Sequence, residues 1–330
     1  MSSIQLNKSN FFYNLDVIVA RAGAISKVAL VLKDNAYGHG LLEMATLAAE
    51  YGITKAVVRS NIEAQKVEDF FEYILVLADT PNRVSQKIRY TINDLNTISQ
   101  FPKGTRVELK VNTSMNRNGV NMQDINRTID AINLQGLKLE AIFTHHSCAD
   151  ELHGNYEIQK SNFEQIKKSA PKGLRFHSCN SAALFREEDF SEDMVRVGIA
   201  AYGCLELPKT FNAPELRPVL SLYAKKISQR ELDIGESVGY GATFVAKSKL
   251  TVSNYDFGYG DGFLRACSNY YVTPQNIKVA GRISMDNSSF LSKEEKLLIF
   301  DDARAVSKFA KTISYEILTS LKSYIKREIV

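Results

Sequence analysis

The sequence predicts an α/β protein built as an N-terminal (β/α)8 barrel, residues 1–218, followed by a smaller, mainly β domain, residues 219–330. At 330 residues the chain exceeds the size at which one hydrophobic core stops growing, which favours two domains. Up to residue 197, short apolar runs alternate with stretches of helical spacing. Beyond Pro218 the apolar runs alternate in polarity and are interrupted by glycines, as in a β domain.

Eight short runs are interpreted as the strands of the barrel. They cover residues 28–32, 55–59, 73–77, 89–92, 106–111, 137–144, 174–179 and 194–197. The first is a run of five aliphatic residues, which is typical of a strand buried on both faces. Eight alternations within about two hundred residues match a (β/α)8 barrel at the lower limit of its usual size.

Helix signals follow several of these strands. Residues 41–48 have apolar positions at helical spacing. Ser60 and Glu63 have the spacing of a capping box, which marks a helix start. Pro81 after Thr80 predicts a further helix, with proline at its first position. The helix after the fifth strand is expected to end near Gly136.

The second domain is predicted mainly from its glycines and its alternating polarity. Glycines at positions 235, 239, 241, 258, 260 and 262 interrupt the runs between residues 220 and 300. A helix over 302–311 and a final strand over 312–317 are expected to complete the domain.

Bulk composition excludes several classes of function. With 45% apolar and 24% charged residues the chain has the composition of a globular protein. A net charge of +4, without a basic tract, does not favour nucleic acid. No run of eighteen apolar residues and no signal-peptide core is present, so we expect no membrane association and a cytoplasmic protein. The four cysteines have no CxxC spacing, which favours reduced thiols and no metal site.

Lys33 comes directly after the first buried strand, where the catalytic rim of a barrel lies. A lysine in this position is most often only solvated. An amine in partly apolar surroundings, however, loses its proton more readily and can form a Schiff base with pyridoxal phosphate. Residues 31–40, Val-Leu-Lys-Asp-Asn-Ala-Tyr-Gly-His-Gly, resemble the cofactor-lysine motif of the alanine racemase family, with Asp34 where alanine is usual. The resemblance implies that Lys33 and Tyr37 contact the cofactor.

The loops after the seventh and eighth strands have the chemistry to bind a phosphate, as they do in many barrels. Ser181, beside Asn180, places a hydroxyl at a predicted helix start, and Gly198-Ile199 lets backbone approach closely. An ordinary helix cap and a turn glycine are the alternatives. Both segments resemble those of the same family, as does Arg196, which by resemblance contacts the pyridine nitrogen. A structural salt bridge is the other reading of Arg196.

Residues 108–119 resemble the racemase stretch whose arginine contacts the cofactor phenolate and the substrate carboxylate, here Arg117. The stretch departs from the family at Asn112, Ser114 and Asn118. Lys110 stands where some family members have a carbamylated lysine. His145 stands at the family's histidine position, and His146 is expected to face away because neighbouring strand residues alternate.

The second domain matches the family at further motifs in the same order along the chain. Residues 235–244 resemble the segment of the tyrosine base, which identifies Tyr240. Resemblance further implies that the Met285 backbone contacts the substrate carboxylate and that Tyr315 contacts the phosphate. The residues implied for substrate access are Asp150, Tyr259, Arg265, Arg282 and Ile313.

Together these motifs identify the chain as resembling the alanine racemases. The resemblance implies a pyridoxal-phosphate isomerase that interconverts L- and D-alanine, with Lys33 and Tyr240 as the two bases, and that supplies D-alanine for peptidoglycan. It also implies a homodimer with shared active sites. Alternatives are a racemase for serine or a broader range of amino acids, a barrel-type decarboxylase, a non-catalytic pyridoxal-phosphate-binding protein, and a metal-dependent barrel hydrolase.

Overall fold

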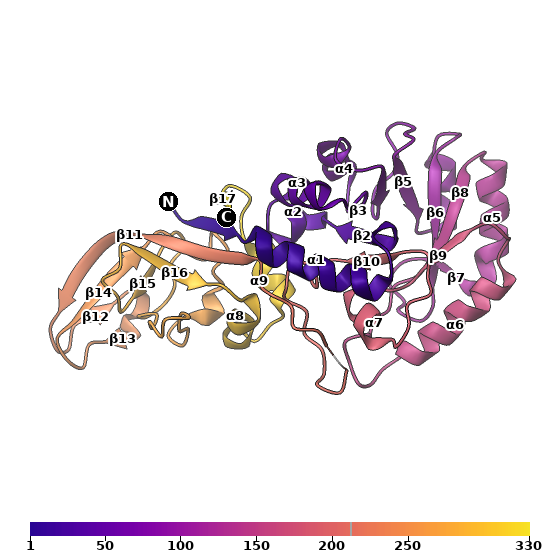
Figure 1. The fold of residues 1–330 in the computed structure, drawn as a ribbon. Helices are drawn as coiled ribbons and strands as arrows, with labels where there is room; N and C mark the ends of the chain where they lie inside the picture. Colours follow the sequence, from indigo (N-terminus) through magenta and orange to yellow (C-terminus); the bar gives the residue numbers. More distant parts are fainter. Residues whose placement is uncertain (212) are drawn as a thin grey trace.

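In the computed structural model, which describes residues 1–211 and 213–330, a barrel and a β domain lie end to end in an elongated molecule (Figure 1). Eight parallel strands form the barrel: β2 (Val28–Val31), β3 (Lys55–Val58), β4 (Tyr73–Val76), β5 (Ile88–Ile92), β6 (Arg106–Asn112), β8 (Lys138–Phe143), β9 (Arg175–His177) and β10 (Val195–Val197). They pair in the order β10-β2-β3-β4-β5-β6-β8-β9. Between β9 and β10 the backbone bonds are few, such as Arg196 N–H to Cys179 O at 3.0 Å, so the barrel is nearly closed. All eight predicted strands are confirmed.

Helices cover the outside of the barrel. They are α1 (Lys8–Ala22), α3 (Leu41–Tyr51), α4 (Asn61–Val67), α5 (Ile125–Leu134), α6 (Tyr156–Ser169) and α7 (Ser181–Arg186), and a short strand, β7 (Val120–Asn121), pairs with β6. The prediction of a helix that starts at Pro81 is wrong, because residues 80–87 form bends and irregular backbone. That segment has one apolar side chain beyond Pro81, Val84, which is exposed. A helix there has no apolar face to bury, and burial supplies most helical stability.

The β domain is a six-stranded sheet that includes both ends of the printed chain. Its strands are β1 (Ser3–Leu6), β11 (Leu220–Leu232), β14 (Leu250–Tyr255), β15 (Ser288–Phe290), β16 (Lys296–Phe300) and β17 (Lys326–Ile329). A separate hairpin joins β12 (Ser237–Val238) to β13 (Phe244–Val245). β1 pairs with β11 and β17, so the first strand belongs to this sheet although α1 covers the barrel.

Two helices of the second domain lie beside the barrel. The helix predicted over 302–311 is confirmed as α8 (Ala303–Ala310), whereas the strand predicted over 312–317 is wrong. Residues there form α9 (Ser314–Ser320). Ser314, Ile317, Leu318 and Leu321 are buried, and their spacing of three, four and seven places them on one helix face. β-Branched residues at 312, 313 and 317 favoured a strand locally, but burial of this face favours the helix.

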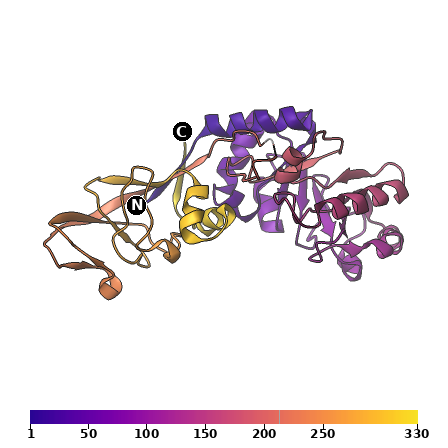
Figure 2. The same cartoon turned by 90° about the horizontal axis from the view of Figure 1, so that it is seen from below.

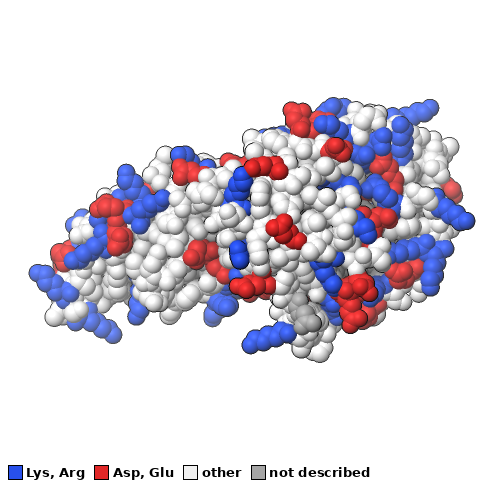
Figure 3. Space-filling model, viewed as in Figure 1, with Lys and Arg blue, Asp and Glu red and all other residues white. Residues whose placement is uncertain are grey.

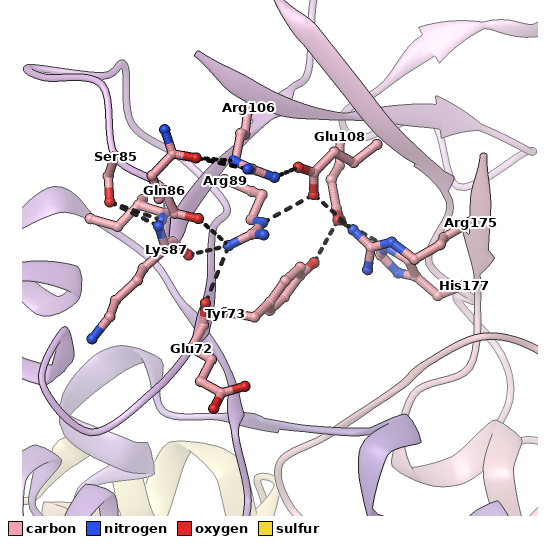
Figure 4. A network of polar contacts seen from close by, with 12 residues as sticks. Glu72, Tyr73, Ser85, Gln86, Lys87, Arg89, Arg106, Glu108, Arg175 and His177 are labelled. Carbon is pink, nitrogen blue, oxygen red and sulfur yellow. Dashed lines mark hydrogen bonds and ion pairs between the residues drawn. The ribbon is translucent and has the colours of Figure 1, made fainter. Parts of the chain in front are cut away.

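A network of charged side chains reaches into the barrel interior, where apolar residues are usual. In Figure 4, Glu108 of β6 accepts hydrogen bonds from Tyr73 of β4 at 2.6 Å and from Arg175 of β9 at 2.9 Å. The guanidinium groups of Arg89 and Arg175 lie over the Tyr73 ring, 4.8 and 5.2 Å from its centroid. Glu140 pairs with Arg89 and Arg175 at 3.1 Å and also with Arg106.

The surface has no dominant charged region on the face seen in Figure 3, where basic and acidic side chains are interspersed. Within residues 1–211 and 213–330, no helix combines the length and the apolar character needed to cross a membrane.

Candidate active site

Lys33 begins α2 (Lys33–Tyr37), a short turn at the carboxyl end of β2. Asp34, Asn35 and Ala36 have left-handed backbone angles, with φ of 54°, 56° and 52°, and Tyr37 has φ of 50°. Left-handed conformations are costly for residues other than glycine, because the Cβ crowds the following carbonyl oxygen. Four such residues in succession require contacts from outside the turn.

The carboxylate of Glu63 supplies several of those contacts from α4. Its Oε1 accepts from the Asp34 N–H at 2.7 Å and from the Asn35 N–H at 3.4 Å, and its Oε2 accepts from the Arg59 N–H at 2.7 Å. The predicted capping box is therefore only half formed: Ser60 Oγ accepts from the Glu63 N–H, whereas the Glu63 side chain serves the Lys33 turn. Sequence reasoning did not identify this role of Glu63.

Four cationic side chains gather at the mouth of the barrel, those of Lys33, Lys110, Arg117 and Arg196. Burial lowers the pKa of Lys110 to about 8, with further contributions from the charges of Arg117, Arg196 and Lys33. Burial holds the pKa of His145 well below its usual value, and the positive charges of Arg196, Lys110 and Arg117 lower it further. Among the described residues, Lys33, Lys110 and Arg117 have no ion-pair partner. The mouth therefore attracts an anionic ligand.

Arg196 is buried on β10 and is held by four of its five N–H groups. Nη1 donates to the imidazole Nδ1 of His177 and to the His177 carbonyl, and Nη2 donates to the carbonyls of Thr144 and Ser178 at 2.7 and 3.1 Å. Nε–H has no acceptor within the part of the chain that the structure describes. That remaining donor can bind an acceptor atom of a ligand at the mouth.

A buried chain of contacts leads from Arg196 back to Glu108. Because His177 Nδ1 accepts from Arg196, its Nε2 carries the proton and donates to Glu108 at 2.9 Å. Burial disfavours ionisation of Glu108, but His177, Arg175 and Tyr73 outweigh it and lower its pKa to about 2. Burial lowers the pKa of His177, which is therefore neutral between a cation and an anion.

Three hydroxyl groups and one backbone segment meet beside the lysine turn: the hydroxyls of Tyr37, Ser181 and Tyr315 and the backbone at Gly198. A Cβ on Gly198 would lie 2.7 Å from the Tyr37 hydroxyl, and the Tyr37 and Tyr315 rings lie 5.8 Å apart. Ser181 Oγ accepts from the Gly198 and Ala200 N–H groups at 3.1 and 3.3 Å, which leaves its own proton free to donate. Burial raises the pKa of both tyrosines, which remain protonated donors.

Asn180 and Ile199 lie in the same loops. The Asn180 side chain accepts from the Ala183 N–H at 2.9 Å and caps α7, so it orients the Ser181 loop. Ile199 is buried. This set of donors, with the four cations and the remaining Nε–H of Arg196, fits pyridoxal phosphate: hydroxyls for a phosphate, cations for a phenolate and one donor for a ring nitrogen.

Two histidines at the end of β8 face opposite sides. A β-bulge at Glu140, where the register with β6 shifts, precedes them. His145 lies among the cations of the mouth. His146 packs outside, with Nε2 at 3.0 Å from Ser178 Oγ and its ring 4.8 Å from that of Tyr156 on α6. The expectation that His146 faces away agrees with these contacts.

Residues at which the sequence departs from the family shape the loop before Arg117. The Asn112 Oδ1 accepts from the N–H groups of Ser114 and Asn116 at 3.2 and 3.0 Å. Ser114 has φ of 124°, where glycine is favoured, and its buried hydroxyl lacks a partner among the described residues. Asn118 lies with Arg117 in a pocket at the rim.

A second cluster lies on the β domain, away from the mouth. Tyr240 is 69% exposed and Met285 56% exposed. The Arg282 guanidinium lies beside Gly241, and the Tyr259 N–H donates to the Ser284 carbonyl, so these segments are neighbours. The β12–β13 hairpin, which carries Tyr240, lies at the end of the molecule far from the barrel in both Figures 1 and 2.

The predicted access residues are likewise divided between the two domains. Asp150, Ile313 and Tyr315 line one pocket beside the barrel, together with Glu206. Arg265 is exposed on the β domain, in the short helical turn Arg265–Cys267. One chain therefore brings Lys33, Lys110, Arg117, His145 and Arg196 together but does not bring Tyr240, Met285, Tyr259, Arg265 or Arg282 to them.

Comparisons with known proteins agree with this fold. The family model described as "Alanine racemase, N-terminal domain" matches residues 6–206, and "Alanine racemase, C-terminal domain" matches residues 219–329. An alanine racemase of Campylobacter curvus is 41% identical, with all of both chains covered. A solved alanine racemase of Clostridium difficile is 26% identical with a TM-score of 0.89, covering 100% of this chain and 95% of that one. A solved histidine racemase of Leuconostoc mesenteroides, 22% identical with a TM-score of 0.87 and covering 100% of this chain and 98% of that one, shares the fold.

Proposed function

Because the chain belongs to the alanine racemase family, we propose that it interconverts L- and D-alanine with pyridoxal phosphate, by a two-base mechanism. The chain is an isomerase of that family. The single observation that carries the mechanism is the placement of Lys33 at the carboxyl end of β2, among unpaired cations and beside the hydroxyls of Tyr37 and Ser181. We assign the barrel to residues 1–218, except that β1 pairs into the sheet of the β domain, and the β domain to residues 219–330.

The cofactor is held by the barrel in this proposal. The hydroxyls of Tyr37, Ser181 and Tyr315 would donate hydrogen bonds to its phosphate, beside the backbone of Gly198 and Ile199. When bound, pyridoxal phosphate supplies a carbonyl that captures the amino group of the substrate and a conjugated ring that makes its α-proton removable. Asn180 positions the phosphate loop through its cap on α7.

Arg196 directs the chemistry at the ring nitrogen. Its free Nε–H would donate to that nitrogen, and because arginine does not give up its proton, Arg196 would leave the nitrogen unprotonated. Such a contact would favour return of the α-proton over side reactions. His177 and Glu108 hold the guanidinium in place from inside the barrel.

Two bases on opposite sides of the substrate carry out the inversion. Lys33 removes or returns the α-proton of D-alanine, and Tyr240 of the partner subunit does so for L-alanine. Arg117 and the Met285 backbone of the partner subunit bind the substrate carboxylate. His145, neutral among cations, links Tyr240 to Arg196, whose charge favours the phenolate needed for catalysis.

Homodimerisation completes the site, because the second base, Tyr240, is exposed at the far end of its own chain and reaches only the site of a partner. Substrate reaches the site between the acidic pocket of Asp150, beside Ile313, and the partner's arginines. Tyr259, Arg265 and Arg282 of the partner subunit form that second wall. A passage lined by both signs of charge suits a zwitterionic amino acid.

We place the reaction in the cytoplasm, where it supplies D-alanine for peptidoglycan. The four cysteines of the chain are free thiols, as expected in a reducing compartment. Family membership supports the product, and the cell-wall role follows from the use of D-alanine in peptidoglycan.

Racemisation itself tests the proposal. Purified protein with pyridoxal phosphate and L-alanine should form D-alanine, and Lys33→Arg and Tyr240→Phe should each lower the rate about 10²–10⁴-fold, the usual contribution of a general base. Lys27→Arg, just before the other end of β2, is the matched control and should keep the rate. Borohydride, which fixes the cofactor to the amine that holds it, should mark the peptide containing Lys33.

Fixation at another lysine, or full activity in Lys33→Arg, would overturn the assignment of the site. Faster turnover of L-serine than of L-alanine would overturn the assignment of the substrate while leaving the chemistry in place.

A further inference from the structure

Arg327 of β17 directs all five of its N–H groups to backbone carbonyls. Nε and Nη2 donate to the Gly38 carbonyl at 3.0 and 2.7 Å. Nη1 donates to the carbonyls of Ser323 and Ile325 at 3.1 and 2.6 Å, and Nη2 also donates to that of Lys322 at 3.2 Å. A lysine, with three donors around a single nitrogen, does not reproduce this planar arrangement.

Gly38 is the end of the left-handed turn that begins at Lys33, and its surroundings are crowded. A Cβ on Gly38 would lie 1.9 Å from the Leu318 carbonyl oxygen of α9. A Cβ on Gly40 would lie 2.6 Å from Cδ of Arg327. The last segment of the β domain, from α9 to β17, therefore covers the turn directly, and the Arg327 side chain passes over it.

The left-handed turn needs support at both ends. Its four non-glycine residues, from Asp34 to Tyr37, have φ between 50° and 56°, a conformation that each would leave if unconstrained. Glu63 accepts hydrogen bonds at the start of the turn. At its end, the Gly38 carbonyl accepts hydrogen bonds from Nε and Nη2 of Arg327. Hydrogen bonds from a charged donor are stronger than those from a neutral one.

The carbonyls that orient Arg327 are themselves fixed to the β domain. The Lys322 N–H donates to the Asp261 carbonyl at 3.1 Å, and the Tyr324 hydroxyl donates to the Asp261 carboxylate at 2.6 Å. The guanidinium therefore joins an anchored turn, residues 322–325, to Gly38.

We infer that Arg327 is a positioning residue for this enzyme: it holds the left-handed turn and so fixes the Lys33 amine and the Tyr37 hydroxyl, without touching substrate or cofactor. The inference rests on the proposed function for the roles of Lys33 and Tyr37. The hold on the turn itself is a property of the chain alone.

Arg327→Ala is compared with Lys326→Ala, its neighbour on β17, whose exposed ammonium pairs with Glu328. Amide hydrogen exchange of the cofactor-free protein is measured by peptide, with equilibrium dialysis of pyridoxal phosphate and with kcat and KM for L-alanine. In Arg327→Ala, exchange over residues 33–41 should rise about tenfold while β4 is unchanged. Pyridoxal phosphate affinity and kcat should each fall about tenfold, the size of a lost charged hydrogen bond, with KM within about twofold. Lys326→Ala should match the wild type.

Arg327→Lys keeps the charge and provides a second test if Arg327→Ala does not fold, with effects expected between wild type and Arg327→Ala. Unchanged exchange over 33–41, or a rise shared equally with β4, would overturn the inference, as would equal effects of Lys326→Ala. If the wild type neither binds pyridoxal phosphate nor racemises alanine, the proposed function fails, whereas local exchange in Arg327→Ala still decides whether Arg327 holds the turn.

Discussion

Asp34, which follows Lys33, stands where the family resemblance places alanine. In the structure it has φ of 54°, and aspartate tolerates left-handed backbone better than alanine because its short polar side chain can bond locally. Its carboxylate pairs with Arg59 at 3.1 Å and points toward the surface. The substitution therefore favours the turn and does not place a negative charge beside the Lys33 amine.

Lys110 has the surroundings of a lysine that reacts with carbon dioxide. A carbamate forms on the neutral amine, and burial together with Arg117, Arg196 and Lys33 lowers the pKa of Lys110 to about 8. A negative carbamate there would be stabilised by the same three cations. We predict a carbamate carbon signal in ¹³C NMR with labelled bicarbonate, which increases as the pH rises from about 6 to about 8.

The signal should vanish in Lys110→Ala and persist in Lys103→Ala, which removes an exposed lysine. A spectrum without a carbamate at pH 8, or one that Lys110→Ala leaves unchanged, would show that Lys110 remains an amine. Asn112 and Ser114 would then be the first residues to examine, since they alter this loop relative to the family.

At the scale of the element, the sequence of strand β6 indicates that one face of the strand is polar. Arg106, Glu108, Lys110 and Asn112 occupy every second position, whereas Val107, Leu109 and Val111 occupy the others and are buried. This alternation normally indicates a strand with one face in water. In this barrel the polar face of β6 points inward and Glu108 is buried. The alternation is visible in the sequence, but sequence reasoning did not use it to place Glu108 in the interior.

Glu108 should couple the stability of the barrel to pH. Its pKa is lowered from 4.5 to about 2 in the folded chain, so the carboxylate stabilises the fold above about pH 4.5 and this stabilisation is lost as the pH falls toward 2. Glu108→Gln removes the buried carboxylate that pairs with Arg175, which keeps its pair with Glu140, and should lower the free energy of unfolding at pH 7 by about 3 kcal/mol. The variant should also lose stability less steeply between pH 4.5 and 2, in urea titrations at each pH.

Glu50→Gln removes a carboxylate whose partner, Lys8, is exposed, and should change the free energy of unfolding by less than about 1 kcal/mol. If the free energy of unfolding falls equally steeply between pH 4.5 and 2 in Glu108→Gln and in the wild type, Glu108 is not the group that titrates.

At the scale of the molecule, the two sets of site residues lie in different domains. The barrel mouth holds Lys33, whereas Tyr240 lies on the hairpin at the far end of the β domain (Figure 1). Under the proposed function, a chain of this shape supplies both bases to one site by pairing with a second copy. The dimer that we propose should bury about 2,000 Å² or more, and two-fold symmetry would give it two such sites.

Subunit exchange tests the shared site. Inactive Lys33→Ala and Tyr240→Phe proteins are mixed, and their subunits are allowed to exchange. If the bases act across the interface, a mixed dimer has one intact site and one site with neither base, so activity returns to about half of wild type per mixed dimer.

No recovery despite proven exchange would mean that both bases act within one chain. Full activity of a monomer at high dilution would exclude the dimeric site as well. Mixing Lys33→Ala with Lys33→Arg is the matched control, since every site in that mixture lacks Lys33.

Local errors in the sequence prediction have a common cause. Residues 80–87 have a good helix start but no apolar face, and residues 312–317 have β-branched residues but also helical spacing of buried side chains. In both segments the outcome depended on what the rest of the fold could bury. Local propensity does not contain that information.

The sequence by itself determined the eight-strand alternation, the change to a β domain and the family resemblance, because hydrophobic period and local motifs lie within a few residues of one another. Tertiary structure alone decided the left-handed turn after Lys33, the chain of contacts from Arg196 to Glu108 and the hydrogen bonds of Arg327 to the Gly38 carbonyl. Each of these depends on contacts between residues far apart in the chain, up to the 289 positions that separate Gly38 from Arg327. Such contacts form only where packing brings the strands together, and no local pattern specifies which pairs will meet.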